Sequence, residues 1–320
     1  MQAIRIHAFG GPEVLTTETI DDPVPGPGEI RIRVHAIGVN PVETYVRAGA
    51  YGPRAFPFTP GTDCAGVVEL VGPGVANHSP GQRVYTAGTV SGAYADTVIA
   101  TSAQVHPLPD NLDFEQGAAI GIPYATAWRS LVDIAGVTRG AWVLVHGATG
   151  GVGVAAVQIA KHLGAHVVGT AGSDAGEALV GSLGTDHCVR HDRDGYREAA
   201  LACTPGGAGF HVIVEMAAHR NLGADTALLA RAGRVVVVGS RGPVEVNARD
   251  LMLRDASVHG MLLFNTPAEE LAAIHARLGE CFEASAFAPV ISRRFALRDA
   301  AEAHRAVLEP GATGKLVLVP

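Results

Sequence analysis

The first third of the chain alternates apolar and polar residues over short stretches. Residues 29–40 read EIRIRVHAIGVN, a run in which apolar and polar side chains largely take turns. Side chains of a strand point alternately to the two faces of a sheet, so this alternation predicts a half-buried strand. Further stretches of this kind lie between glycines and prolines: DCAGVVELVG (63–72), GQRVYTAG (81–88) and AYADTVIA (93–100). Residues 1–122 are therefore expected to be rich in β-structure.

From residue 141 to about 263, short apolar runs alternate with segments of helical spacing. The apolar runs predict strands at 141–146, 166–170, 187–191, 211–215, 234–239 and 258–264. Helices are predicted near 151–163, 176–183, 196–203, 221–231 and 248–254. Almost continuously apolar strands joined by helices are typical of a parallel sheet covered on both faces. This segment is expected to be a doubly wound α/β domain.

The segment 109–136 marks the expected domain junction. It is rich in alanine, and Asn111 or Asp113 stands where it could cap a helix. From residue 268 we expect a helix, the stretch PVISRRFAL (289–297), another helix and the terminal strand KLVLVP (315–320). We expect this last strand to return to the first domain. The prediction is a dinucleotide-type domain at 123–264, inserted in a β-rich domain made of 1–122 and 265–320.

Composition narrows the class of protein. The 320 residues are 48% hydrophobic and only 17% charged, with a net charge of −7 and no block of Lys and Arg. Electrostatic binding of nucleic acid is therefore not favoured. The four cysteines are far apart and form no CxxC pair, so neither a disulfide framework nor a zinc ribbon is indicated. No apolar run approaches the roughly 20 residues of a membrane span, and the start resembles no signal peptide. A soluble cytoplasmic protein is expected.

A glycine-rich stretch suggests the first function. Gly147, Gly150 and Gly153 follow a predicted strand and open a predicted helix, with the spacing G-x-x-G-x-x-G. Glycines at such a place allow a tight turn, a close approach of the backbone to phosphate, and close helix packing. The helix N-terminus adds unpaired N–H groups and the positive end of a dipole. The stretch therefore predicts a dinucleotide site.

The end of the second strand bears on which dinucleotide binds. An NAD site usually has an Asp or Glu there, which holds the ribose 2′-hydroxyl. Here the strand ends in Gly172 and Ser173, which leave room for a 2′-phosphate. Asp174 follows, and it either caps the next helix or reaches the ribose as the missing acid. Arg190 and His191, at the end of the third strand, could supply a donor or a positive charge. We expect NADPH rather than NADH.

Taken together, these stretches carry a family resemblance. FGGPEVL, VHAIGVNPVETYVRAG, PGTDCAGVVE, TVSGAYAD, LDFEQGAAIGIPYATAWRSL, VLVHGATGGVG, VVVVGSRGPVEVNARDLM and GATGKLVL extend from Phe9 to Leu318. The chain resembles the zeta-crystallin-like quinone oxidoreductases, which belong to the zinc-free medium-chain dehydrogenase/reductase superfamily. The resemblance implies a Rossmann domain inserted in a GroES-like domain. It also implies NADPH-dependent reduction of quinones, in this family often described as one-electron transfer to ortho-quinones.

The resemblance also implies the site residues. Asn40 and Tyr45 match family positions near the nicotinamide, and Tyr51 is added as a second tyrosine of the substrate pocket. The remaining expected cofactor residues are Thr149, Gly150, Gly151, Val152, Gly172, Ser173, His191, Asn221, Val238, Gly239, Ser240, Arg241, Met261, Leu262 and Leu263. Gly176 stands where some bacterial relatives carry a lysine for the 2′-phosphate. The preference for NADPH is therefore expected to be modest.

No metal is expected. Where related alcohol dehydrogenases have a zinc-binding Cys and a GHE motif, this chain has Asn40 and the residues Gly61–Asp63. His187, Cys188 and His191 form the only tempting cluster, but alternation along a strand puts His187 and Cys188 on opposite faces. Without a Lewis acid, alcohol oxidation is not favoured, whereas an electrophilic quinone needs mainly a well-placed cofactor and a polar group near its oxygen. We expect Asn40, Tyr45 or Tyr51 to supply that group and name no essential general acid.

Two other functions stay open. Reduction of an activated C=C bond, as in enones or alkenals, would use the same geometry. A non-catalytic protein that binds NADPH or RNA, as is implied for some zeta-crystallins, is an alternative of another class; the acidic balance argues against RNA. In relatives the strand at 258–263 is the sheet edge used for dimerisation, which suggests a homodimer.

Overall fold

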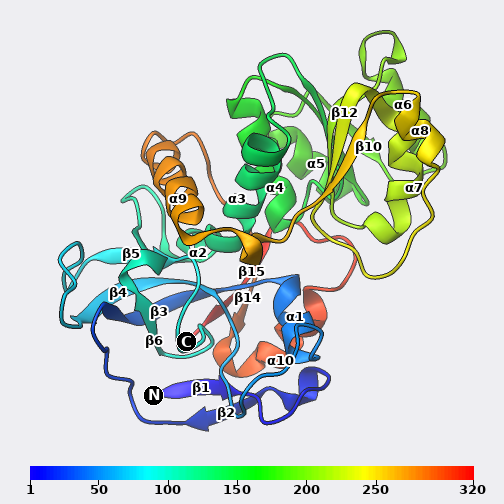
Figure 1. Cartoon of the computed structure of the whole chain (residues 1–320). Helices are drawn as coiled ribbons and strands as arrows, with labels where there is room; N and C mark the ends of the chain where they lie inside the picture. Colours follow the sequence, from blue (N-terminus) through cyan, green and yellow to red (C-terminus); the bar gives the residue numbers. More distant parts are fainter. The chain divides into compact units, whose positions relative to one another are not determined.

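The structure is a computed structural model that describes all residues, 1–320. It divides into two compact units, which are described separately (Figure 1). Unit 1 consists of Met1–Pro123, Ala268–Pro310 and Gly314–Pro320, and unit 2 of Tyr124–Pro267 and Gly311–Thr313. None of the helices has the length and apolar character that crossing a membrane requires.

Unit 1 is built on a seven-stranded sheet with the order β14-β15-β3-β4-β5-β7, in which β6 also pairs with β3. Its strands are β3 (Glu29–Val39), β4 (Asp63–Val71), β5 (Arg83–Thr86), β6 (Thr97–Thr101), β7 (Val105–Pro107), β14 (Ile291–Ala296) and β15 (Lys315–Val319). β1 (Gln2–Arg5) and β2 (Thr16–Thr19) form a separate hairpin-like pair. The expected return of the terminal strand is confirmed, because β15 pairs antiparallel with β3.

The alternation along residues 29–39 gives β3 its buried face. Ile30, Ile32 and Val34 are buried in the core of unit 1, whereas Arg33 and His35, which point to the other face, are exposed. The helices of unit 1 are α1 (Pro41–Arg47), α2 (Phe114–Gly117), α9 (Ala268–Glu283) and α10 (Ala300–Ala306). Of the two candidate caps, Asp113 is the one used: its side chain accepts a hydrogen bond from Gln116 N at the start of α2.

Unit 2 contains a six-stranded parallel sheet with the order β10-β9-β8-β11-β12-β13. The strands are β8 (Trp142–Val145), β9 (His166–Ala171), β10 (His187–Arg190), β11 (Phe210–Glu215), β12 (Leu229–Val237) and β13 (Ser257–Gly260). Chain order places β8 at the start, next to β9 on one side and β11 on the other. This is the doubly wound Rossmann order, with its topological switch between β8 and β11. The expected fold is confirmed.

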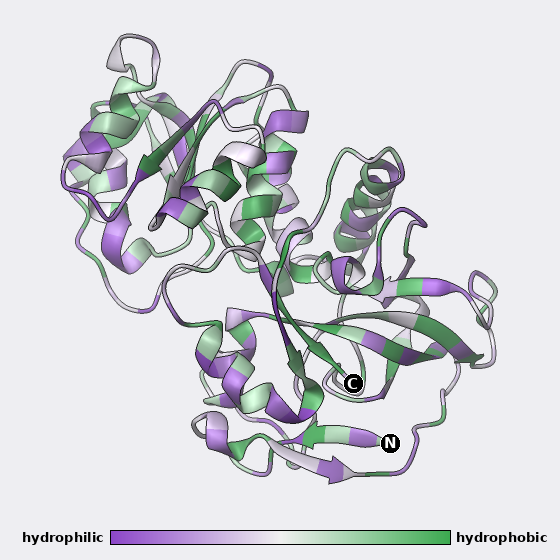
Figure 2. Cartoon of the chain, turned by 180° about the vertical axis from the view of Figure 1, so that it is seen from behind, coloured by the Kyte–Doolittle hydropathy of each residue, from purple (hydrophilic) through white to green (hydrophobic).

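The helices of unit 2 lie between these strands: α4 (Gly151–His162), α5 (Asp174–Ser182), α6 (Tyr196–Ala202), α7 (Ala218–Leu228) and α8 (Ala248–Met252). α3 (Gly121–Trp128) leads into the unit and continues as a π-helical segment, Arg129–Ile134. Figure 2 shows hydrophobic residues on both the strands and the helices, and the buried core includes Leu144, Val168, Ile213 and Val235 on the strands.

Two predicted elements end elsewhere. The last strand was expected to reach residue 264, but β13 ends at Gly260 and a 3₁₀ turn follows at Leu263–Asn265. The final ladder bond runs from Met261 N to Val237 O, and Val237 is the last residue of the only neighbouring strand, β12. A strand has no partner beyond that point. The helix expected at 221–231 is α7, which both begins and ends earlier.

Candidate functional site

The glycine loop of unit 2 forms a tight turn between β8 and α4. Gly147 adopts a left-handed backbone conformation with φ of 58°. Its N–H donates to Thr170 Oγ1 at 3.0 Å, and Ala148 N donates to Thr170 O at 3.1 Å. The loop is therefore fastened to β9, and α4 begins immediately after it, at Gly151.

The loop glycines have different physical roles. A Cβ on Gly153 would lie 2.1 Å from Gly147 O, so this position needs glycine for the helix to pack on the loop. A Cβ on Gly150 would meet nothing nearer than Gly147 O at 3.7 Å. Gly150 is the N-cap of α4, and no side chain caps this helix. The first N–H groups of a 12-residue helix thus remain available to an anion beside open space.

The end of β9 forms a small polar corner. Ser173 caps α5, and its Oγ accepts from Gly176 N at 3.1 Å. The His191 ring lies over Gly172, because a Cβ there would be 2.7 Å from His191 Nε2. A Cβ on Gly176 would be 2.9 Å from Thr149 Cγ2. The structure therefore brings these five residues together. It also explains why residue 176 is a glycine and not the lysine of some relatives, because the side chain of a larger residue would press against Thr149.

Asp174 does not cap α5; that role belongs to Ser173. Its carboxylate is paired with the guanidinium of Arg190, which also binds Asp192 at 2.7 Å and lies 3.6 Å from Glu177. One arginine thus pairs with three acids. The guanidinium of Arg190 is therefore engaged by these acids, and the carboxylate of Asp174 is engaged by Arg190. Burial and the positive field of His146 lower the pKa of His191, so its ring is neutral at pH 7 and acts by hydrogen bonding.

The remaining expected cofactor residues lie on α7 and in the segments that follow β12 and β13. Asn221 is on α7, and its Nδ2 donates to Glu215 Oε1 at 3.3 Å. Val238 N and Gly239 N both point to Glu215 O, at 2.8 and 3.2 Å. Ser240 Oγ donates to Gly242 O at 2.9 Å, and Arg241 N donates to His219 Nδ1 at 3.1 Å. Met261, Leu262 and Leu263 follow β13 rather than lying within it.

In unit 1, Asn40 is part of a closed polar network. It caps α1, and it is only 2% exposed. Its Nδ2 donates to Asp63 Oδ2 at 2.9 Å and to Glu43 Oε1 at 3.3 Å, while Lys315 Nζ donates to its Oδ1. Both amide hydrogens are used inside the protein. The hydrogen bond to substrate that was expected of Asn40 does not fit this arrangement, which makes Asn40 part of the supporting structure.

Lys315 is the single cation among these buried groups. Its ammonium lies 3.6 Å from Asp63 Oδ2, and burial lowers its pKa while Asp63 and Glu43 oppose that effect. Burial likewise raises the pKa values of Glu43 and Asp63, again opposed by Lys315. The buried cluster around Asn40 therefore consists of an ammonium group, an amide and two carboxyl groups.

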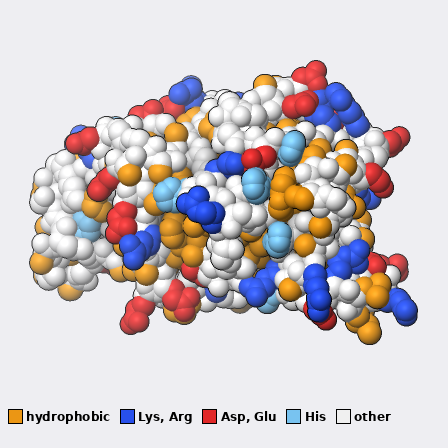
Figure 3. All heavy atoms as spheres, turned by 90° about the horizontal axis from the view of Figure 1, so that it is seen from above, with side chains coloured by type: hydrophobic (Ala, Val, Ile, Leu, Met, Phe, Trp, Pro, Cys, Tyr) orange, Lys and Arg blue, Asp and Glu red, His pale blue; other side chains and the backbone are white.

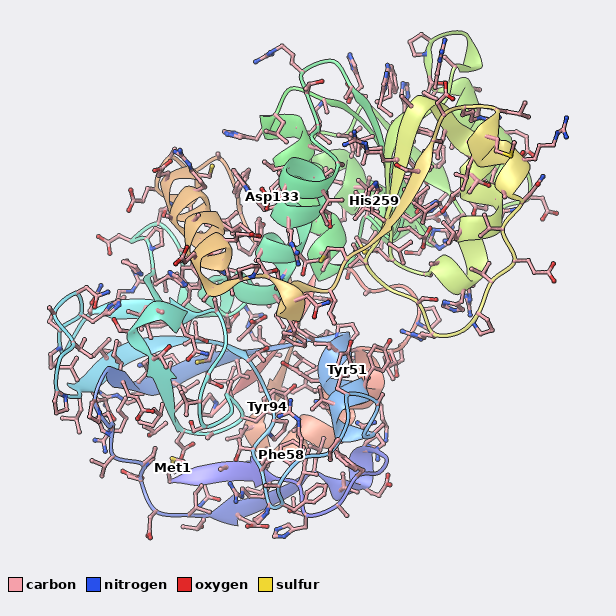
Figure 4. The ribbon with its side chains drawn as sticks, in the orientation of Figure 1. Met1, Tyr51, Phe58, Tyr94, Asp133 and His259 are labelled. Atoms are coloured by element: carbon pink, nitrogen blue, oxygen red, sulfur yellow. The ribbon has the colours of Figure 1, made fainter.

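The network continues as a directional chain of hydrogen bonds. Arg47 Nη1 lies 2.9 Å from His304 Nδ1, so this nitrogen must be the acceptor. His304 Nε2 is then the donor to the Tyr94 oxygen at 3.0 Å, and the Tyr94 hydroxyl donates to Glu43 Oε2 at 2.7 Å. Tyr94 is labelled in Figure 4, inside unit 1. Each donor faces one acceptor, so the direction of every hydrogen bond is determined.

Tyr45 and Tyr51 lie on α1 and on the loop that follows it; Tyr51 is labelled in Figure 4. Tyr45 is partly buried, and the Tyr51 side chain is 43% exposed. Burial, with a smaller contribution from Tyr45, raises the pKa of Tyr51, which keeps its hydroxyl protonated as a donor. The role of these two tyrosines in a substrate pocket stays a prediction.

His187, Cys188 and His191 do not converge. His187 begins β10 and stacks near Trp142 with ring centroids 6.3 Å apart, whereas His191 follows the other end of the strand. Four residues of strand separate them by about 13 Å. Sequence reasoning missed Lys315 and a buried group of His146, Glu215 and Asp225. The available signal was an ionisable residue ending each of two apolar strands, VLVH and HVIVE.

Comparisons with known proteins are consistent over the whole chain. Residues 26–110 match the alcohol dehydrogenase GroES-like domain, and residues 151–278 match the family described as zinc-binding dehydrogenase. The human protein named quinone oxidoreductase is 45% identical over 100% of this chain and 98% of its own length. A solved structure titled NAD-dependent alcohol dehydrogenase has a TM-score of 0.93 at 31% identity, with all of both chains covered. A mycobacterial protein solved in complex with NADPH has a TM-score of 0.91 at 32% identity, again with all of both chains covered.

Proposed function

Since the chain belongs to the quinone oxidoreductase family, we propose that it is an NADPH-dependent enzyme that reduces quinones without a metal. The observation that carries the proposal is the pairing of an open glycine loop with a corner that holds no unpaired acid. Gly150 leaves space beside the uncapped start of α4, and the carboxylate of Asp174 is paired with Arg190. A pyrophosphate fits the first feature and a 2′-phosphate fits the second.

NADPH, when bound, supplies the reducing equivalents. The residues of unit 2 bind and orient it: the N–H groups at the start of α4 hold the pyrophosphate, and Ser173 and His191 donate hydrogen bonds to the 2′-phosphate. Ser173 Oγ accepts from Gly176 N and still has its own hydrogen to donate. In unit 1, Tyr45 and Tyr51 supply hydroxyl donors for the quinone oxygen, because the amide of Asn40 is already engaged. We propose one-electron transfer to ortho-quinones as the reaction course.

A homodimer in the cytoplasm is part of the proposal. β13 is the outer strand of the parallel sheet, and His259 on it is labelled in Figure 4. The chain that follows β13 exposes Leu262 by 37% and Phe264 by 50%. An unpaired strand edge flanked by apolar side chains is suited to pairing with a second copy. On the face drawn in Figure 3, acidic and basic side chains are interspersed, without the wide basic area that RNA binding would favour.

Turnover with a panel of acceptors tests the proposal. We expect NADPH oxidation with ortho-quinones, little with simple enones or alkenals, and none with primary alcohols plus NADP. Activity should survive a chelator, and elemental analysis should find no stoichiometric zinc. Faster turnover of enones than of quinones would assign the chain to the C=C reductases instead. Semiquinone detected by electron spin resonance would support one-electron transfer, and light scattering would give the mass of the assembly.

A further inference from the structure

Three buried ionisable side chains meet at the switch point of the parallel sheet. His146 directly follows β8, Glu215 ends β11, and Asp225 is on α7. Their exposures are 3%, 0% and 0%. His146 Nε2 lies 2.9 Å from Asp225 Oδ1 and 3.5 Å from Glu215 Oε2. Nothing in the proposed reaction uses them, although they lie where the doubly wound fold binds its ligands.

The arrangement requires a shared proton. Glu215 Oε2 and Asp225 Oδ2 are buried, and neither oxygen accepts a hydrogen bond from another group of the protein. A buried acceptor without a donor is costly, whereas a proton on Glu215 directed to Asp225 would satisfy both oxygens. Burial, with the adjacent Asp225, raises the pKa of Glu215 to about 7, against the opposing effect of His146. Burial alone would lower the pKa of His146, but its hydrogen bond to Asp225 raises it.

The charges then balance. A protonated His146, an ionised Asp225 and a protonated Glu215 sum to zero, which suits a fully buried cluster. The donor atoms lie within 4.8 Å of one another, so a divalent cation has to be considered as well. Two ligands of a tetrahedral zinc, each about 2.0–2.1 Å from the metal, are about 3.3 Å apart. The 2.9 Å between His146 Nε2 and Asp225 Oδ1 is shorter and fits a hydrogen bond.

Glu215 connects this cluster to the cofactor loops. Its Oε1 accepts from Ala217 N and from Asn221 Nδ2. Its backbone oxygen accepts from Val238 N and Gly239 N. One residue thus ties together the loop after β11, the start of α7 and the loop after β12. Three of the residues expected to line the cofactor, Asn221, Val238 and Gly239, are thus bonded directly to Glu215.

We propose that Glu215 is the positioning residue of the NADPH site, holding the loops after β11 and β12 in their binding conformation while it shares a proton with Asp225. The inference rests on the proposed function, since NADPH is the molecule that these loops receive. Loss of the proton places two carboxylates side by side without a donor between them. We therefore expect the affinity for NADPH to fall as the pH rises through about 7.

Other ionisable groups face the cluster and enter the design of the test. Arg197 and Tyr196, on α6, interact electrostatically with it, and His191 beyond β10 interacts with His146. Burial raises the pKa of Tyr196 above its ordinary value, so its hydroxyl stays protonated between pH 6 and 8.5. His191 and the 2′-phosphate itself can titrate near this range, and both are present in the wild type and in a Glu215 variant. The difference between two pH profiles therefore isolates Glu215.

Glu215→Gln is the informative variant. Its amide keeps an oxygen for Ala217 N and Asn221, and its NH₂ group donates to Asp225 as the protonated acid does. We expect Kd for NADPH at pH 6.5 within about twofold of wild type. From pH 6.5 to 8.5 the wild-type Kd should rise about tenfold more than that of the variant. Glu215→Ala should bind at least about tenfold more weakly at every pH. Asp186→Asn, which removes a carboxylate paired with Lys161 at 2.7 Å elsewhere in unit 2, is the matched control and should keep the wild-type profile.

Fluorescence titration of the full-length chain with NADPH, with circular dichroism as a check of folding, decides the question. Parallel pH profiles of wild type and Glu215→Gln would overturn the proposal, as would a tenfold loss of affinity in Glu215→Gln at pH 6.5. Stoichiometric divalent metal in the wild type that is absent from Glu215→Gln would mean that a cation, and not a shared proton, holds the cluster together. This result would also overturn the proposal. Should Glu215→Ala fail to fold, the comparison with Glu215→Gln still decides. A wild-type chain that binds no NADPH at any pH would refute the proposed function instead.

Discussion

The two units treat their polar groups in opposite ways. In unit 1, Lys315, Asn40, Asp63 and Glu43 satisfy one another, and none is more than 4% exposed. In unit 2, the start of α4 has no capping side chain, and Gly150 faces open space. A closed network stabilises and orients the backbone around it, whereas unpaired N–H groups at an open helix start bind an anion. A polar group at a predicted site can therefore bind a ligand directly only where its hydrogen-bonding capacity is left over, whereas an engaged group can only position its neighbours.

The largest effect is expected from opening the closed network. Lys315→Met removes the only cation from two buried carboxylates, which should lower the free energy of unfolding by about 3–5 kcal/mol. Chemical denaturation measures the change. Arg277→Met is the control, because it breaks an exposed pair with Glu280 and should cost at most about 0.5 kcal/mol. Similar small values for both variants would mean that the network does not stabilise unit 1.

Acid should weaken the same network through His304. Burial, together with Arg47, lowers its pKa to about 3. Between pH 6.5 and 4 the unfolded chain therefore binds a proton at this residue and the native chain does not, so stability is lost as the pH falls. Over this pH range the free energy of unfolding of the wild type should fall by about 3 kcal/mol more than that of His304→Gln. The difference in stability between the two proteins should therefore become smaller as the pH falls. A gap that is constant over this range would contradict the neutral, directional chain through His304 and Tyr94.

The glycine loop offers a matched pair of substitutions. Gly153→Ala forces a Cβ against Gly147 O and should destabilise the fold by about 2–3 kcal/mol. Gly150→Val has room and an ordinary extended backbone, so stability should change by less than about 1 kcal/mol. Its side chain would occupy the phosphate position, however, and NADPH affinity should fall more than about 30-fold, or roughly 2 kcal/mol. Unchanged binding in a folded Gly150→Val protein would remove this loop from the cofactor site.

The smallest effects concern the choice between NADPH and NADH. Ser173→Ala and His191→Ala should each reduce the preference for NADPH by up to about tenfold, or about 1.4 kcal/mol. Asp174→Asn should act in the opposite direction, because it releases part of the Arg190 charge toward the 2′-phosphate. Dissociation constants for both cofactors on the four proteins measure this. Tighter binding of NADH by the wild type would show that Asp174 holds the ribose.

Much of unit 2 could be predicted from the sequence because its signals are local. The apolar runs correctly indicated the six strands, and the glycine spacing indicated the loop between β8 and α4. The predicted end of the last strand was wrong because a strand ends where its neighbour does, and the sequence of 258–264 holds no information about Val237. Likewise, Ser173 rather than Asp174 caps α5, since both residue types are good caps and only the backbone path decides between them.

The sequence by itself determined the two-part organisation, the parallel sheet, the glycine-rich turn before α4 and the family, because periodicity and glycine spacing act over a few residues. Only the tertiary structure decided what Asn40 does, since its partner Lys315 is 275 residues away. It also decided that Arg47 meets His304 across 257 residues, and that His146, Glu215 and Asp225 share one buried place. A side chain's free hydrogen-bonding capacity depends on neighbours brought in by the fold, and no local pattern records them.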